Sequence, residues 1–183
     1  MSKKVLITGA SGGFGALTVK TLLKEGHKVA ATMRNSASKN KGIADELSGL
    51  GAEIIEMDVT SDDSANQGVS KATELMGGLD VVINNAGVGV LGIQENFTVD
   101  DFKKLFEVNV FGVQRVTRAA LPQLRSQGSG LVIFVSSLLG RMTLEEKMAQ
   151  IVCIWNQKKE LILDQNGNFD PVKASKNLPY GIV

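Results

Sequence analysis

A glycine-rich turn near the start of the chain constrains the fold more than any other feature of the sequence. The turn, Gly9–Gly15, follows the apolar run Lys4–Thr8 and precedes an amphipathic helical segment. Gly9 permits a tight turn off a strand, Gly13 lets backbone approach a diphosphate, and Gly15 lets the helix pack close to the sheet. The start of the helix then offers free N–H groups and partial positive charge to phosphate. The pattern predicts a dinucleotide-binding turn; the alternative is a tight strand–helix turn without a ligand.

Apolar runs rich in β-branched residues recur along the chain and predict a parallel sheet. Because these runs are continuously apolar and alternate with segments of helical period, both faces of the sheet are expected to be covered. Right-handed crossovers then favour an α/β, doubly wound, Rossmann-like fold with the strand order 3-2-1-4-5. The expected strands are Lys4–Thr8, Lys28–Met33, Glu53–Met57, Asp80–Asn84 and Leu131–Ser136. The expected helices are at about 14–25, 39–50, 62–76 and 99–125, the last with Pro122 near its end.

The last quarter of the chain has a different composition, which marks the one candidate domain boundary. Of the 20 glycines, 17 lie in residues 1–139. We therefore predict a dinucleotide-binding domain over residues 1–140 and an atypical tail over 141–183. Within the tail, Thr143–Glu146 matches a capping box and is followed by an apolar stripe, so a helix is expected at about 143–157 and loops after it.

Composition and charge exclude several functional classes. The net charge is +1, so no strong basic field is available to bind nucleic acid or an anionic membrane. The lone Cys153 excludes an internal disulfide and a cysteine-rich zinc site, and no metal is expected. No apolar run approaches the roughly 18 residues of a membrane helix, and the opening segment does not resemble a secretory signal. A cytoplasmic protein that acts on small molecules is the expectation.

The end of the second expected strand bears on the choice of dinucleotide. An acidic residue at this point commonly binds the ribose 2′-hydroxyl, but residues 31–35 read Ala-Thr-Met-Arg-Asn. The planar cation of Arg34 can pair with a 2′-phosphate, and nothing in this segment repels one. The sequence therefore favours NADP over NAD, and the alternative is that Arg34 is a solvated loop charge.

Four motifs in order make residues 1 to about 141 resemble the short-chain dehydrogenase/reductase family. They are Thr8-Gly9-x-x-x-Gly13-x-Gly15, the Asn-Asn-Ala-Gly of Asn84–Gly87, Asn109 within Glu107–Gly112, and Ser137 within Val135–Gly140. The resemblance implies hydride transfer between a nicotinamide cofactor and a small-molecule carbonyl or alcohol. It makes Asn109 the family's helix asparagine and Ser137 its active-site serine. Each residue also has a structural alternative: Asn84 and Asn85 as turn formers, Asn109 as a core amide, Ser137 as a strand-end hydroxyl.

By the same resemblance, Asp58 and Val59 border the adenine, and the segment Asn85–Gly87 lines the cofactor ribose. The structural alternative for Asp58 is a cap on the turn that follows it. The full set of expected cofactor-binding residues is Thr8, Gly9, Ser11, Gly13, Phe14, Gly15, Arg34, Asp58, Val59, Asn85, Ala86 and Gly87.

The tyrosine and lysine that move the proton in this family are missing where the resemblance places them. A free phenol is a poor base at neutral pH, so the family's lysine, four residues later, lowers its pKa. At the corresponding positions the sequence has Gln150 and Ile154, and the sole tyrosine, Tyr180, lies 43 residues after Ser137 and directly follows Pro179. The expected oxidoreductase therefore lacks its usual proton donor. The alternatives are a catalytically silent nucleotide-binding or interaction protein, and a non-functional fusion product.

From Gly140 onward the tail is similar instead to the N-terminal segment of family 3 glycoside hydrolases, in Gly140–Gln150 and more loosely in Asn177–Ile182. The catalytic carboxylates of that family come later in its chain, so glycoside cleavage is not expected. The simplest hypothesis is a join of two unrelated pieces near Gly140–Arg141, which leaves a truncated domain of about five strands. The substrate and the oligomeric state stay open, a homo-oligomer being one outcome.

Overall fold

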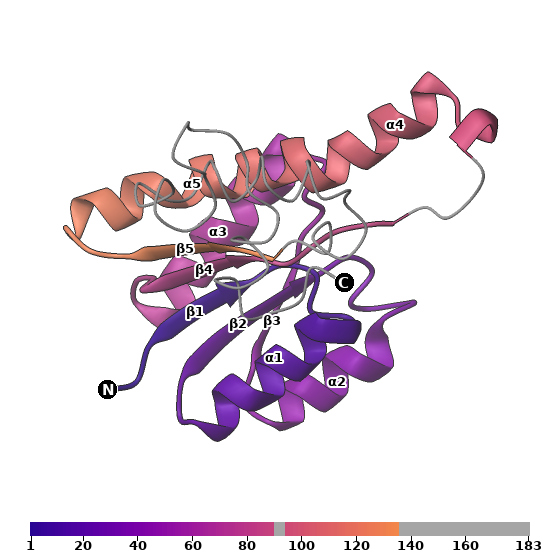
Figure 1. The fold of residues 1–183 in the computed structure, drawn as a ribbon. Coiled ribbons are helices and arrows are strands. Elements are labelled where there is room, and N and C mark those ends of the chain that lie inside the picture. Colours follow the sequence, from indigo (N-terminus) through magenta and orange to yellow (C-terminus); the bar gives the residue numbers. More distant parts are fainter. Residues whose placement is uncertain (90–93, 136–183) are drawn as a thin grey trace, which may run out of the picture. The chain divides into compact units, whose positions relative to one another are not determined.

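Strands and helices alternate through the part of the chain that the computed structural model describes, residues 1–89 and 94–135 (Figure 1). The strands are β1 (Lys4–Ile7), β2 (Lys28–Met33), β3 (Glu53–Glu56), β4 (Val81–Asn84) and β5 (Leu131–Phe134). The α-helices are α1 (Gly13–Lys24), α2 (Lys41–Gly49), α3 (Asp62–Met76), α4 (Val99–Phe106) and α5 (Val113–Ser126). A short 3₁₀ turn, Gln94–Asn96, precedes α4, and a π-helical segment, Glu107–Gly112, joins α4 to α5.

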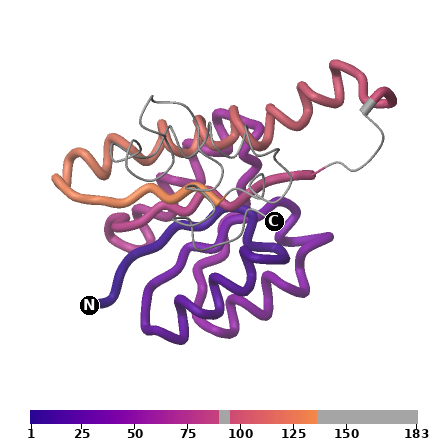
Figure 2. The backbone as a smooth tube through the Cα atoms, viewed as in Figure 1, coloured from indigo at the N-terminus to yellow at the C-terminus, as the bar shows by residue number. Residues whose placement is uncertain are grey.

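The five strands form one parallel sheet in the order β3-β2-β1-β4-β5, which confirms the predicted fold class and strand order. In the centre of the sheet, Val5 of β1 lies opposite Val29 of β2 on one side and Val81 of β4 on the other. The chain path in Figure 2 shows how the order arises. After β3 the chain crosses to the other side of β1 to form β4, and in such sheets ligands usually bind at the carboxyl ends of the two strands that flank this reversal, here β1 and β4.

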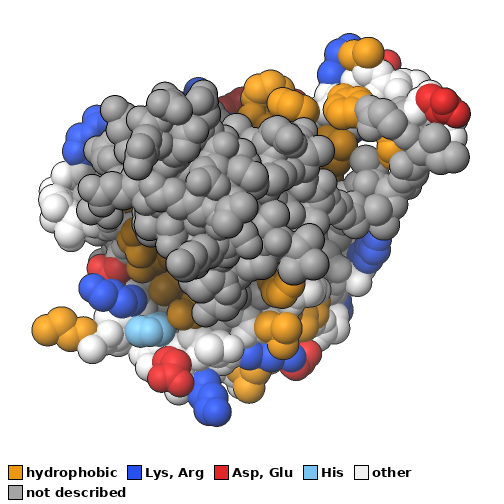
Figure 3. Space-filling view, in the orientation of Figure 1, with side chains coloured by type: hydrophobic (Ala, Val, Ile, Leu, Met, Phe, Trp, Pro, Cys, Tyr) orange, Lys and Arg blue, Asp and Glu red, His pale blue; other side chains and the backbone are white. Residues whose placement is uncertain are grey.

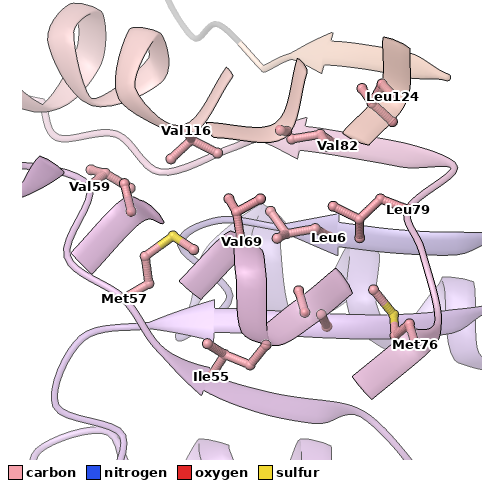
Figure 4. Close-up of a cluster of buried hydrophobic side chains, with 14 residues drawn as sticks. Leu6, Ile55, Met57, Val59, Val69, Met76, Leu79, Val82, Val116 and Leu124 are labelled. Carbon is pink, nitrogen blue, oxygen red and sulfur yellow. The ribbon is translucent and has the colours of Figure 1, made fainter. Parts of the chain in front are cut away.

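Two hydrophobic clusters, one on each face of the sheet, hold the helices in place. On one face, α1 and α2 pack on β1 and β2 through residues such as Val19, Leu47 and Val5. On the opposite face, α3 and α5 contribute Val69 and Val116 (Figure 4). The side chains labelled in Figure 4 are all buried and point toward one another: Leu6, Ile55, Met57, Val59, Val69, Met76, Leu79, Val82, Val116 and Leu124. Their removal from water is the main favourable contribution to folding.

The expected helical stretch over 99–125 is confirmed in its extent, but a π-helical segment between α4 and α5 interrupts the α-helix. Helix α4 begins with a capping box in which the side chains of Thr98 and Asp101 each bond the other's backbone N–H. Pro122 lies inside α5 near its end, as expected, and the helix continues to Ser126. Proline leaves the carbonyl four residues earlier without its helical partner. That residue, Arg118, is exposed, so water can satisfy the carbonyl.

Strand β5 differs from the other strands in exposure. Leu131, Ile133 and Phe134 are all exposed, whereas Val132 packs against the cluster shared by α3 and α5. Helix α4 also has exposed apolar residues, Phe102 and Phe106 among them, and hydrophobic side chains are visible at the surface in that region (Figure 3). The predicted tail helix, Ser137, the domain boundary near residue 140 and the join at Gly140–Arg141 all lie outside the described residues and stay predictions.

Candidate functional site

The glycine turn Gly9–Gly15 connects the carboxyl end of β1 to the start of α1, and its glycines are needed for two close contacts. A Cβ atom on Gly15 would lie 2.2 Å from the carbonyl oxygen of Gly9, and one on Gly9 would lie 2.7 Å from the Cα of Ala86. Gly9 and Gly13 also have positive φ angles of 68° and 52°, a region that favours glycine. Gly12 has open space around it and an extended backbone. The glycine turn therefore lies in close contact with the residues that follow β4 and with the first turn of α1.

The amino end of α1 is arranged to accept an anion. The first N–H groups of a helix have no partner within the helix, and the aligned peptide dipoles place partial positive charge there. Helices α3 and α4 have two acidic residues each in the first turn, whereas α1, like α2 and α5, has none. Its first residues, Gly13 and Phe14, are exposed, so these N–H groups remain open to a ligand.

Thr8 and Asn85 bind the glycine turn to the end of β4. The buried Thr8 hydroxyl oxygen accepts hydrogen bonds from the backbone N–H of Asn85 at 3.0 Å and of Ala86 at 2.9 Å. The Asn85 side-chain amide donates to the carbonyl oxygens of Thr8 at 2.9 Å and Gly9 at 3.2 Å. The turn and the Asn-Asn-Ala-Gly segment thus form one hydrogen-bonded unit, and the neighbouring Asn84 donates to Thr117 of α5.

Asn109 lies in the π-helical segment Glu107–Gly112 and connects it to the residues that follow β4. Its Oδ1 accepts from the Val88 N–H and its Nδ2 donates to the Val88 carbonyl, both at 2.9 Å. A π-helical turn widens the helix locally and is frequent at functional sites. The same segment includes Gly112, where a Cβ atom would lie 2.8 Å from the Val59 side chain. The π-helical segment therefore contacts the chain after both β3 and β4.

Asp58 and Val59 follow β3 at the same edge of the sheet. One Asp58 carboxylate oxygen accepts from the N–H of Thr60 at 2.9 Å and from its hydroxyl at 2.8 Å, the structural capping role. Partial burial on its own raises the pKa of Asp58, but the Thr60 hydrogen bonds and the charge of Arg34 outweigh it and lower the pKa below its ordinary value. Val59 is buried against Gly112.

Arg34 directly follows β2, and its guanidinium Nη1 lies 3.9 Å from the second oxygen of Asp58. The Arg34 side chain is 57% exposed, so it is accessible as well as paired. The loop after it is held by Glu56, the last residue of β3, whose carboxylate accepts hydrogen bonds from Asn35 and Ser36. The sequence reasoning missed Glu56, because its role depends on β3 lying beside β2. The alternating acids of the segment Glu56-Met57-Asp58 were the available signal.

The described site residues thus gather at one edge of the sheet, at the carboxyl ends of β1, β2, β3 and β4. Two groups are linked within it. Thr8, Gly9, Gly15, Asn85 and Ala86 form the first group, and Arg34 with Asp58 forms the second. Ser137 lies outside the described residues. Among the described residues no set of three histidine, cysteine or carboxylate side chains is grouped to bind a metal, and no helix has the length and apolarity to cross a membrane.

A five-stranded parallel sheet with this glycine turn defines a Rossmann-like α/β protein. A family model described as "short chain dehydrogenase" matches residues 3–149, about four fifths of the chain. The chain therefore belongs to the short-chain dehydrogenase family. The match includes the positions of the four motifs and extends a few residues past the boundary expected near residue 140.

Relatives and solved structures agree with this assignment. The chain is 37% identical over 138 residues to a 3-ketodihydrosphingosine reductase of Bacteroides thetaiotaomicron, covering 75% of this chain and 48% of that protein. It is 39% identical over 145 residues to the oxidoreductase BOA17 of Botryotinia fuckeliana, covering 78% and 52%. The crystal structure of a short-chain dehydrogenase from Streptomyces avermitilis superposes with a TM-score of 0.70 at 32% identity, covering 84% of this chain and 62% of that one. The chain thus spans about half the length of these curated relatives.

Proposed function

We propose that the chain binds a nicotinamide dinucleotide at the carboxyl edge of its sheet, with the diphosphate at the amino end of α1. The observation that supports this most strongly is the close approach of Gly15 to the Gly9 carbonyl, because it brings the start of α1 against the glycine turn at the end of β1. The absence of an acid from the first turn of α1 leaves the positive end of the helix uncompensated.

The residues proposed to surround the dinucleotide fall into three groups. The backbone of the glycine turn, with Ser11 and Phe14 at its exposed side, faces the diphosphate. Asp58 and Val59 border the adenine, and the segment Asn85–Gly87 lines the nicotinamide ribose. Asn85 does this chiefly by holding the turn, because its side-chain amide already donates to the carbonyls of Thr8 and Gly9.

Arg34 supports a preference for NADP over NAD. Its side chain is largely exposed, and its guanidinium lies 3.9 Å from the Asp58 carboxylate. A planar cation of this kind can form paired hydrogen bonds with a 2′-phosphate. Replacing Arg34 by aspartate is expected to weaken NADP binding more than NAD binding, and an equal loss for both would exclude a role at the 2′-phosphate.

The reaction we propose is hydride transfer between the cofactor and a small-molecule carbonyl or alcohol, with a ketone favoured by the name of the Bacteroides reductase. The nicotinamide ring, when bound, supplies or accepts the hydride. Ser137 is proposed to donate a hydrogen bond to the substrate oxygen, and Asn109 to hold the segment after β4 through Val88. Gln150 and Ile154 stand where the family's tyrosine and lysine are expected, and neither can transfer the hydroxyl proton.

A second candidate function follows from those two residues. A chain that retains the dinucleotide site and lacks the phenol and ammonium would bind the cofactor without turnover, as a nucleotide-binding or interaction protein. We also propose that the protein is cytoplasmic. We propose further that its tail arose by fusion, which resequencing across the codons for residues 136–145 tests.

Calorimetric titration of the purified chain with NADP, NADPH and NAD, together with absorbance assays on a panel of aldehydes and ketones, separates the candidates. Binding with turnover supports the oxidoreductase, and binding without turnover supports the silent protein. Turnover that survives Tyr180→Phe would show that this chain does not need a tyrosine phenol. Absence of binding by folded protein contradicts both candidates.

A further inference from the structure

The loop after β2 binds an anionic side chain of the protein itself, the carboxylate of Glu56. Glu56, the last residue of β3, accepts a hydrogen bond from the Asn35 N–H at 2.6 Å through one carboxylate oxygen. The other oxygen accepts from the Ser36 N–H at 2.8 Å and from the Ser36 hydroxyl. Asn35 has a φ of 54°, in the left-handed region, and its N–H and that of Ser36 both donate to this one carboxylate. Such a pair of N–H groups commonly binds an external anion such as phosphate.

A second carboxylate lies beside the same loop. Asp58 follows Glu56 by two residues, and its Oδ2 is 3.9 Å from the Arg34 guanidinium. Partial burial and the charge of Asp58 act to raise the pKa of Glu56, but the hydrogen bonds from Ser36 and Asn35 hold this pKa below its ordinary value. Arg34 therefore has one carboxylate, Asp58, beside its guanidinium and a second, Glu56, bound to the two residues that follow it, an arrangement that the sequence of the β2 end does not disclose.

We propose that Glu56 is a specificity-determining residue that opposes NADP, because its carboxylate occupies the two N–H groups next to Arg34 and repels a 2′-phosphate. The inference rests on the proposed function and deepens it. A phosphate monoester carries about −1.5 to −2 charges at neutral pH, whereas the ribose 2′-hydroxyl of NAD carries none. The Glu56 carboxylate therefore opposes the binding of NADP and leaves the binding of NAD unaffected. Arg34 favours NADP and Glu56 limits that preference.

The test measures discrimination between two nicotinamide-free fragments, ADP-ribose and 2′-phospho-ADP-ribose, by isothermal titration calorimetry, so that no turnover is needed. Glu56→Gln keeps the shape of the side chain and removes its charge. We expect the affinity ratio to shift toward the 2′-phosphorylated fragment by roughly two- to fivefold, the effect of one partly exposed charge. Glu53→Gln is the matched control, because Glu53 is an exposed glutamate at the other end of β3; its ratio is expected to equal that of the unmodified chain.

The ratio distinguishes specificity from a merely structural role. If Glu56→Gln weakens both fragments by the same factor, Glu56 only folds the loop and the inference is overturned. A shift toward ADP-ribose overturns it as well. If the unmodified chain binds neither fragment, the proposed function is contradicted, and the inference that rests on it is contradicted too. If both fragments bind and Glu56→Gln leaves their affinity ratio unchanged, only the inference is overturned.

A measurement on the unmodified chain keeps the inference testable if Glu56→Gln does not fold. In NMR spectra of the labelled protein, saturating 2′-phospho-ADP-ribose is expected to leave the amide signals of Asn35 and Ser36 close to their positions in the ADP-ribose complex, because both N–H groups stay bonded to Glu56. Large additional shifts at these two amides would show that the phosphate displaces the carboxylate, and would overturn the inference.

Discussion

The side-chain amide of Asn85 lies 2.9 Å from the carbonyl oxygen of Thr8 and donates a hydrogen bond to it. This bond connects the first residue after β4 to the residue that follows β1, 77 positions earlier in the chain. It fixes the glycine turn relative to the segment that follows β4. The geometry of the proposed diphosphate site therefore depends on polar contacts that come from β4 as well as on the turn's own glycines.

Replacing Thr8 by valine is expected to destabilise the fold. Valine has the same shape but no oxygen, so the N–H groups of Asn85 and Ala86 lose their acceptor. Leaving partly buried donors unpaired costs about 1–3 kcal/mol. Urea unfolding measures the change, and Thr8→Ser, which keeps the hydroxyl, should recover most of it. Equal stability of the valine and serine variants would contradict the proposed contact.

Gly15→Ala is expected to impair both folding and dinucleotide binding, because its Cβ would lie 2.2 Å from the Gly9 carbonyl oxygen and 2.7 Å from the Asn85 amide. Gly12→Ala is the matched control, since nothing lies within 4 Å of a Cβ at that position. Calorimetry with ADP-ribose should show at least a tenfold loss of affinity for Gly15→Ala, a difference of about 1.4 kcal/mol, and a much smaller change for Gly12→Ala. Similar losses in the two variants would argue against the close contact.

Asp58 is expected to contribute to a loss of folding stability at acidic pH. Because the pKa of its carboxyl is lowered in the folded chain, Asp58 stabilises the fold above the pKa of an unfolded aspartate, about 3.9. That contribution is lost as the pH falls through the folded pKa. Asp58→Asn should therefore show a weaker fall in urea midpoint between about pH 5 and pH 2 than the unmodified chain. Parallel curves for the two proteins would show that Asp58 contributes nothing to this dependence.

Asn109→Ala is expected to loosen the segment after β4. The Val88 N–H donates to Asn109 Oδ1, so its exchange with solvent deuterium should accelerate when that acceptor is removed. Asn109→Asp keeps an acceptor oxygen and loses the donor to the Val88 carbonyl, so a smaller acceleration is expected. Unchanged exchange at Val88 in the alanine variant would mean that the asparagine does not hold this segment.

The sequence predicted the fold well where one local pattern decides the structure. All five strands agree with the expected ranges to within about two residues at each end, because buried parallel strands are continuous apolar runs bounded by turns. The sheet order followed from the general rules for crossovers. The π-helical segment Glu107–Gly112 was missed, since the residues around Asn109 have an ordinary helical pattern and the contacts of the segment with Val59 and Val88 are not visible in the sequence.

The site was predictable in its residues more than in their partners. The positions of Thr8, Asn85 and Asn109 at one edge follow from the motifs, but the bonds among them depend on which strands are neighbours. The same limit applies at the end of β2, where the sequence indicates no repulsion of a 2′-phosphate. The structure places the carboxylates of Glu56 and Asp58 beside this segment, and the proposed opposition to a 2′-phosphate rests on these contacts between neighbouring parts of the sheet.

The most direct test of the account is whether the amino end of α1 contacts the diphosphate of a dinucleotide. In backbone-labelled protein, titration with ADP-ribose is expected to shift the amide signals of Gly13, Phe14 and Gly15 in a saturable way, with little change at the start of α3, where Asp62 and Asp63 already compensate the helix charge. Folded protein whose α1 amide signals stay unchanged at millimolar ADP-ribose would contradict the account.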